Sequence, residues 1–203
     1  MTQSLRDAKR ESTRRALAET TYRMVRARGF DQVTIDEITT EVNVSRRTFS
    51  NYFANKEEAV AFVPVDRIRT ELEKWEAPAG IDAAAAVRSV VAHLLASGLP
   101  MMLAELGRLG RRHPPFGPHS REVQWAVWDA VRERLHEVLH IDAPRDRRNL
   151  AMLLGALYGI VSTQLADLDL GDEGPGPEVF LALQESVGEV FTLFEPALRR
   201  IGQ

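Results

Sequence analysis

The stretch from Thr34 to Lys56 restricts the fold of this chain more than any other part of the sequence, and it reads TIDEITTEVNVSRRTFSNYFANK. Thr34 is a suitable N-cap for a helix, and Glu37 three residues later completes a capping box. A tight turn is expected at Asn43, because asparagine adopts the left-handed conformation more readily than any residue except glycine. Ser45 is then placed to cap a second helix. The stretch therefore predicts two short helices joined by a sharp turn, with a third helix starting near Lys56.

The second of these helices has two chemically different faces when residues are spaced at about 100°. Its aromatic face is expected to pack on the preceding helices and carries Phe49, Tyr52 and Phe53. The opposite face is polar and basic, with Arg46, Arg47, Ser50 and Asn51. Guanidinium, hydroxyl and amide groups suit the phosphate oxygens and base edges of a DNA major groove. An ordinary amphipathic helix with a solvated basic face has the same periodicity, so spacing alone leaves both interpretations open.

A longer pattern resembles the DNA-binding domain of the TetR family of transcriptional regulators. It runs Thr34-x3-Ile38 and then Val44-Ser45-x2-Thr48-Phe49-x2-Tyr52-Phe53-x2-Lys56-Glu57, and the similar part extends from about Arg14 to Phe62. Asn43 departs from the pattern, since many relatives have glycine there, but asparagine suits the same conformation. The resemblance implies a regulator that binds double-stranded DNA. The residues expected at the DNA are Thr34, Ser45, Arg46, Arg47, Thr48, Ser50, Asn51, Tyr52 and Lys56.

The distribution of charge agrees with a DNA-binding head, although the asymmetry is small. Residues 1–62 carry 11 Lys and Arg against 9 Asp and Glu, a net charge of +2, and residues 63–203 carry 15 against 20, a net charge of −5. Basic residues crowd the first part of the chain, where a first helix is expected over about 11–28. These N-terminal side chains either follow DNA phosphates or belong to a frayed end.

The whole chain is expected to be all-α, with about nine helices, because no segment shows convincing strand alternation. We expect a DNA-binding domain over residues 1–62, with a linking helix that starts at residue 55, and a ligand-binding and dimerisation domain over 63–203. Pro64 lies inside the linking helix and predicts a kink or break near Phe62 and Val63.

The second domain offers bulky or adaptable apolar side chains as candidates for an effector pocket. Each of them is individually more typical of an ordinary core. The candidates are Leu94, Met101, Met102, Phe116, Trp125, Trp128 and Tyr158.

Two apolar helices near the end of the chain predict an assembly surface. In the first, small residues recur every four positions, which allows another helix to approach closely. In the second, large apolar residues follow helical spacing. The expected interface residues are Ala151, Gly155, Gly159, Thr163, Leu183, Val187 and Phe191. A helix pair buried within a monomer is the alternative.

A literal H-E-x-x-H sequence at residues 136–140 is the main argument for an enzyme. Two histidines four residues apart on a helix can bind zinc, and the glutamate can act as a general base. We expect an accidental match, because His136 and His140 share a polar face that we expect to be exposed, and Pro144 ends the helix soon after them. The chain has no cysteine, which excludes disulfides and thiolate metal sites. No catalytic residue, metal or cofactor is therefore expected.

The sequence favours a homodimeric repressor that a small, mainly apolar ligand releases from a near-palindromic operator. An adaptor that senses a protein instead of a small molecule is the third possibility, and a closed apolar cavity would distinguish the two. The N-terminal sequence does not resemble a secretory signal, and no apolar run approaches the length of a membrane span, so a cytoplasmic protein is expected. The identity of the ligand, the operator sequence and the choice between repressor and activator stay open.

Overall fold

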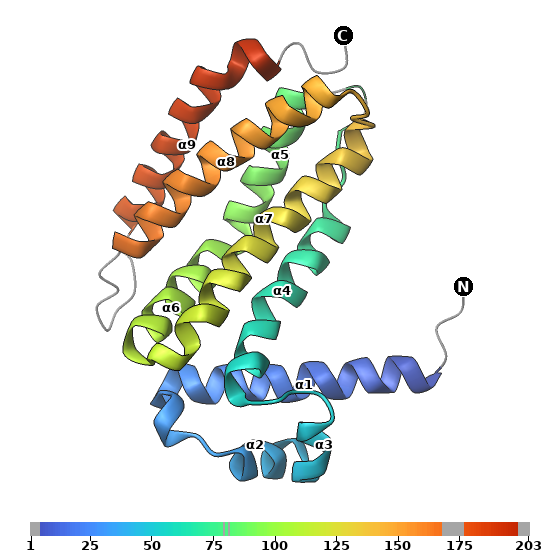
Figure 1. Cartoon of the computed structure of the whole chain (residues 1–203), viewed down its shortest axis with the longest axis vertical. Coiled ribbons are helices and arrows are strands. Elements are labelled where there is room, and N and C mark those ends of the chain that lie inside the picture. Colours follow the sequence, from blue (N-terminus) through green and yellow to red (C-terminus); the bar gives the residue numbers. More distant parts are fainter. Residues whose placement is uncertain (1–4, 79, 81, 168–176, 199–203) are drawn as a thin grey trace. The chain divides into compact units, whose positions relative to one another are not determined.

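The computed structural model describes residues 5–78, 80, 82–167 and 177–198, and it is all-α over these residues, as predicted (Figure 1). Nine α-helices and two short 3-10 helices account for the regular structure of this part. Their bounds are α1 Leu5–Arg28, η1 Phe30–Gln32, α2 Ile35–Val42, α3 Arg46–Ser50, α4 Lys56–Lys74, α5 Ala83–Ala96, α6 Leu99–Arg112, η2 Pro114–Phe116, α7 Gly117–Leu139, α8 Pro144–Asp167 and α9 Pro177–Leu198. Residues 168–176, between α8 and α9, lie outside the described residues.

The chain divides into two compact units. The first comprises Met1–Asp66 with Leu109–Val123, and the second comprises Arg67–Arg108 with Gln124–Gln203. This division falls after Asp66, within α4, and the expected domain boundary at residue 62 stays a prediction. The inclusion of 109–123 in the first unit was not expected, because nothing in the local sequence of that segment indicates its partners.

The first unit is built on α1, whose inner face meets α2 and the aromatic side of α3. Leu17, Val25, Ile38 and Phe49 are completely buried in its core, and Phe53 is nearly so. The segment 109–123 adds Phe116, whose ring lies 5.0 Å from the ring of Phe30 between centroids. This apolar packing holds helices that are too short to be stable alone.

Two helices of the first unit differ from the sequence-based expectation. Helix α1 starts at Leu5, about two turns earlier than predicted, so the basic N-terminal side chains stand on a helix. Helix α4 continues without a break from Lys56 to Lys74 although Pro64 lies inside it. No break is present, because the buried proline removes only one donor and the backbone stays helical on either side of it, and the alternative of a kink stays a prediction.

The second unit has its core between α5, α7, α8 and α9. Helices α8 and α9 lie side by side, and Leu153, Leu157, Leu183 and Val190 are buried in this unit. Among the described residues, no single helix is both long and apolar enough to cross a membrane. The bent pair α5 and α6, at 63° to each other, reaches the required length and composition only when the two are joined.

A buried carboxylate connects α4 to α5 within the second unit. Glu71 is 8% exposed, and its side chain lies 3.0 Å from Nζ of Lys74 and 3.2 Å from Nε2 of His93. The hydrogen bond from Lys74 lowers the pKa of Glu71, against the opposing effect of burial, and the charges of Arg67 and His93 act in the same direction as Lys74. The ionised form of Glu71 therefore stabilises the folded state.

We predict that Glu71→Gln destabilises the protein by roughly 1–2 kcal/mol at pH 7, because charge-assisted hydrogen bonds are lost from a buried site. The pKa of Glu71 is lower in the folded state than in the unfolded chain. The difference in the free energy of unfolding between wild type and variant is therefore fully present above the ordinary glutamate pKa, and it is lost as the pH falls through the lowered pKa of the folded state. Urea unfolding between pH 7 and pH 3 measures the effect. The exposed neighbour Glu73 provides the control, and equal effects of Glu71→Gln and Glu73→Gln contradict the assignment.

Candidate nucleic-acid interface

Helix α2 begins with the predicted capping box. The backbone N–H of Glu37 donates to Oγ1 of Thr34 over 3.2 Å, and the N–H of Thr34 donates to Oε2 of Glu37 over 2.8 Å. Arg28 from the end of α1 donates to the other carboxylate oxygen over 2.9 Å. The hydrogen bonds from Thr34 and Arg28 lower the pKa of Glu37 to about 2. The start of α2 is thus fixed by a carboxylate that stays ionised at neutral pH.

The turn between α2 and α3 has the predicted geometry. Asn43 adopts φ 55° and ψ 50°, which is the left-handed conformation, and its N–H donates to carbonyls of the last turn of α2. Ser45 then caps α3, with Oγ accepting from the N–H of Thr48 over 3.1 Å. Both chain reversal and helix start are therefore encoded by local residues.

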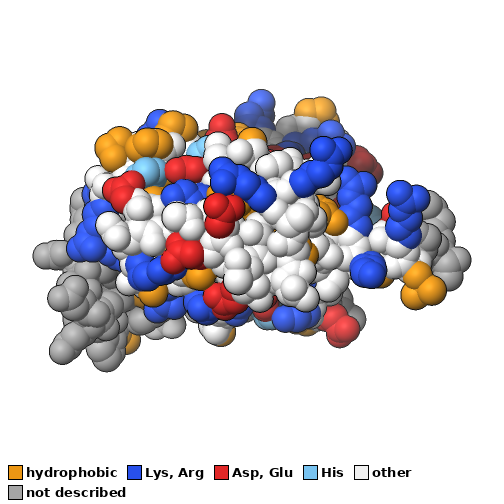
Figure 2. Space-filling view, turned by 90° about the horizontal axis from the view of Figure 1, so that it is seen from below, with side chains coloured by type: hydrophobic (Ala, Val, Ile, Leu, Met, Phe, Trp, Pro, Cys, Tyr) orange, Lys and Arg blue, Asp and Glu red, His pale blue; other side chains and the backbone are white. Residues whose placement is uncertain are grey.

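Helix α3 presents the two faces expected from its sequence. Phe49 and Phe53 are buried, and their rings lie 5.8 Å apart between centroids. Tyr52 is half-buried at the edge of this aromatic side. The side chains on the other face are exposed, namely Arg46, Arg47, Ser50 and Asn51. Figure 2 views the molecule from below, where Lys and Arg side chains are spread over the surface with Asp and Glu between them.

The two arginines of α3 differ in their surroundings. Nη1 of Arg46 lies 3.3 Å from Oδ2 of Asp36 on α2, and both side chains are largely exposed. An exposed pair of this kind contributes at most about 1 kcal/mol, so an external anion competes readily for Arg46. The side chain of Arg47 forms no hydrogen bond or ion pair within the part of the chain that the structure describes. Arg47 is therefore the more available of the two.

Lys56 has an intramolecular role that the sequence analysis missed. Its Nζ donates to the carbonyl oxygens of Phe30 and Val33, each over 2.6 Å. These contacts join the start of α4 to the first residue of η1 and to its C-cap, and they use two of the three ammonium donors. No periodicity in the sequence indicates them, because the partners are backbone atoms more than 20 residues away.

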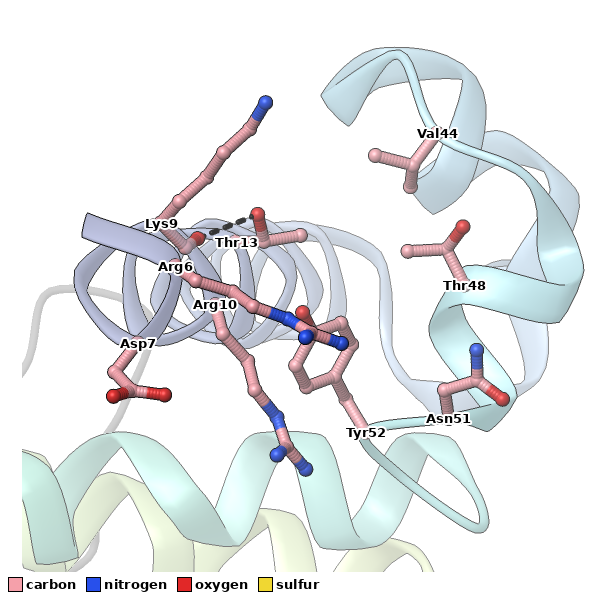
Figure 3. Close-up of a pocket in the computed structure, with 9 residues that line it drawn as sticks. All are labelled: Arg6, Asp7, Lys9, Arg10, Thr13, Val44, Thr48, Asn51 and Tyr52. Atoms are coloured by element: carbon pink, nitrogen blue, oxygen red, sulfur yellow. Dashed lines mark hydrogen bonds between the residues drawn. The ribbon is translucent and has the colours of Figure 1, made fainter. Parts of the chain in front are cut away.

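The analysis also missed a groove between α1 and α3. It has a volume of about 800 Å³, and Figure 3 shows side chains from the two helices on either side of it. The lining residues are Arg6, Asp7, Lys9, Arg10, Thr13, Val44, Thr48, Asn51 and Tyr52. The cluster of basic residues near the N-terminus was a usable signal, but the extent of α1 was needed to place them.

The candidates for an effector pocket are only partly brought together. Leu94 and Trp128 line an apolar cavity of about 60 Å³ in the second unit, and Tyr158 stands edge-on to Trp128 at 5.7 Å. Met101 and Met102 are half-buried outside that lining. Two candidates do not belong to the cavity. The side chain of Trp125 is 66% exposed, because it lies on the outer side of α7, and Phe116 is buried in the first unit.

The candidates for a dimer interface separate into two groups. On α8, Ala151, Gly155, Gly159 and Thr163 are all exposed, and a Cβ built on either glycine meets no atom within 4 Å. On α9, the expectation is corrected, because three side chains face the core of their own unit and are almost fully buried, namely Leu183, Val187 and Phe191. Among the residues of α8 and α9 whose burial is described, the large apolar side chains that are exposed are Met152, Leu181 and Leu193.

The H-E-x-x-H sequence does not have the geometry of a zinc site. Helix α7 ends at Leu139, and His140 has φ 48°, so the two histidines are not on one continuous helix. Within the described ranges no group of three or more His, Cys, Asp or Glu is arranged to hold a metal. His136 is also less exposed than expected, and burial lowers its pKa, with additional effects of Arg132 and Arg147.

Comparison with known proteins agrees with this geometry. The sequence profile described as bacterial regulatory proteins, tetR family, matches residues 17–61. A search of curated proteins gave no significant match. The crystal structure of a transcriptional regulator from Rhodococcus sp. Rha1 has a similar fold, with a TM-score of 0.50 and 20% identity, covering 88% of this chain and 96% of that one.

We predict that Lys56→Met destabilises the first unit by about 1–3 kcal/mol, because two carbonyl groups lose a charged donor. Thermal unfolding followed by circular dichroism measures the loss. Lys9→Met removes an exposed lysine of α1 and serves as the control, for which a change within about 0.5 kcal/mol is expected. Equal stability of Lys56→Met and wild type contradicts the intramolecular role.

Proposed function

We propose that this chain is a regulator of the TetR family, whose profile matches residues 17–61, and that it acts as a homodimeric repressor released from a near-palindromic operator by a small, mainly apolar ligand. DNA-binding regulation follows from the family. Repression, dimerisation, the form of the operator and the ligand are our proposals.

The exposed face of α3 is the single observation that carries the proposal for DNA recognition. The αL turn at Asn43 and the Ser45 cap fix the direction of this helix, while buried aromatic side chains hold its other side. Arg46, Arg47, Ser50 and Asn51 are left as a continuous polar row facing outward. We assign base contacts to this row, with Ser45, Thr48 and Tyr52 beside it. Thr34 and Lys56 stay candidates for phosphate contacts.

The test is selection of bound duplexes from a random pool, followed by affinity measurements on the selected operator and on unrelated DNA. We predict that Arg47→Ala weakens operator binding by about 1–3 kcal/mol and relaxes preference at one base pair, because a bidentate arginine–guanine contact is lost. Arg26→Ala removes an exposed charge near the C-terminal end of α1, and this control should keep the wild-type base preference. If Arg46→Ala and Arg47→Ala both retain the wild-type preference, α3 does not read the bases.

The exposed small residues of α8 support the proposal of a dimer. A helix with glycine at positions 155 and 159 allows a second helix to approach closely, and Met152, Leu181 and Leu193 supply apolar area around the same pair of helices. A two-fold dimer places two α3 helices at a near-palindromic site, with the half-sites about one DNA turn apart.

We predict that Gly159→Glu separates the dimer without disturbing the fold of the monomer, since a side chain built at this position meets no atom of its own chain. Sedimentation velocity at micromolar concentration measures the oligomeric state. Ala96→Glu, which adds the same charge at an exposed position of α5, is the control. A wild-type monomer that binds the operator with full affinity contradicts the dimer.

The cavity in the second unit supports the proposal of an apolar ligand. Every side chain that lines it is apolar, so the pocket offers no partner for a charged group. Its volume of about 60 Å³ is far below the roughly 300–1,000 Å³ of typical ligand sites. A ligand must therefore separate helices of this unit in order to enter. By linkage, a ligand that prefers the separated form weakens DNA binding if the operator prefers the closed form.

We predict that Leu94→Phe mimics the ligand by overfilling the cavity, and that it lowers operator affinity at least fivefold. Ala92→Phe, which enlarges an exposed side chain on α5, is the control and should leave the affinity unchanged. Fluorescence anisotropy with labelled operator measures both variants. Wild-type affinity of a folded Leu94→Phe variant contradicts coupling between the cavity and DNA binding.

A further inference from the structure

The inner face of α1 changes from apolar to basic along a single line of residues. Val25, Thr21 and Leu17 lie four residues apart, and all three are completely buried in the first unit. The same helical spacing continues toward the N-terminus through Thr13, Arg10 and Arg6, with Lys9 beside them. Because α1 is helical from Leu5, these cations continue the face that packs on the core.

The basic part of α1 forms one wall of the groove described above, and α3 with its preceding turn forms the other. The α3 side contributes Thr48, Asn51 and Tyr52, which are neutral hydrogen-bonding side chains, together with Val44. Figure 3 shows Arg6 extended toward the α3 side, while Lys9 and Arg10 point to opposite sides of α1. The carboxylate of Asp7 points away from α3 in the same view.

The basic side chains of this wall are not paired with acidic side chains among the described residues. Arg6, Lys9 and Arg10 are exposed, and they form no hydrogen bond or ion pair through their side chains with any residue that the structure describes. Like charges at positions i and i+4 destabilise a helix by a few tenths of a kcal/mol, and Arg6 and Arg10 have this spacing. An anion in the groove removes the repulsion.

The spacing of these cations suits a polymer of phosphates. Arg6 and Arg10 are separated by about 6 Å along the helix axis. One strand of duplex DNA has a phosphate about every 3.4 Å of its axis. Two or three successive phosphates therefore match the length of the basic wall.

Building on the proposed function, we infer that the groove receives the sugar–phosphate backbone of one operator strand, with Arg6, Lys9 and Arg10 bound to phosphates that flank the bases faced by α3. DNA is favoured over a lipid surface because the opposite wall belongs to α3 itself. The contacts add affinity and salt dependence, and they add no preference for sequence, because phosphates are common to all sequences.

The test compares the full-length wild type with a triple variant, R6A/K9A/R10A, in titrations of the selected operator and an unrelated duplex over a range of salt concentrations. Alanine has the highest helix propensity, so α1 is expected to stay helical, and circular dichroism checks this. We expect the slope of log K against log salt to fall by up to about 2.7 per protomer, since each lost phosphate contact removes about 0.9. The ratio of operator to unrelated affinity should stay within twofold of wild type.

A matched control and a trimmed duplex make the test specific. Arg26→Ala removes one exposed charge from the opposite end of α1 and should leave the slope unchanged. Removing flanking base pairs from the operator should lower the slope of log K against log salt for the wild type. The slope of the triple variant should not change, because this variant already lacks the side chains that contact the flanking phosphates. Equal losses from trimming in the two proteins overturn the inference.

Three other outcomes are informative. An unchanged slope in the triple variant, together with loss of preference in Arg47→Ala, overturns the inference and leaves the proposed function standing. Binding of the wild type to anionic phosphatidylserine vesicles that is lost in the triple variant, with the slope on DNA unchanged, assigns the basic wall to a membrane and also overturns it. Failure of the wild type to select any duplex contradicts the proposed function itself.

Discussion

The packing of Phe49 and Phe53 on α1 and α4 is the interaction on which the DNA-facing surface depends. Helix α3 has only five residues, from Arg46 to Ser50, and a helix of this length is not stable in water by itself. Its aromatic side is buried, and Arg14 from α1 stands 4.2 Å above the ring of Phe62, which in turn contacts Phe53 edge-on. The orientation of every exposed group on α3 follows from this buried side.

Local chemistry explains which features could be predicted from the sequence. The capping box of Thr34 and Glu37, the αL turn at Asn43 and the cap at Ser45 each involve residues within four positions of one another, so the sequence alone specifies them. The two faces of α3 follow from helical periodicity in the same way. The length of α1 was underestimated because its first two turns have no apolar stripe to indicate a helix.

The features that were missed depend on contacts distant in the sequence. Lys56 bonds carbonyls of Phe30 and Val33, and Phe116 packs on Phe30 from a segment more than 80 residues away. On α9, Leu183 and Val187 were expected at an interface, yet hydrophobicity does not distinguish the core of a chain from a surface that another chain covers.

The capping box at α2 has a consequence for how the head can hold DNA. The N-terminus of a helix is ordinarily a favourable site for an external anion, because its first N–H groups have no partners. In α2, the carboxylate of Glu37 already occupies this position and accepts from both the N–H and the hydroxyl of Thr34. A phosphate arriving there meets a resident negative charge instead of open donors. A phosphate contact at Thr34 therefore has to compete with Glu37 for the same donors, and it costs more than a contact at a helix start whose donors are open.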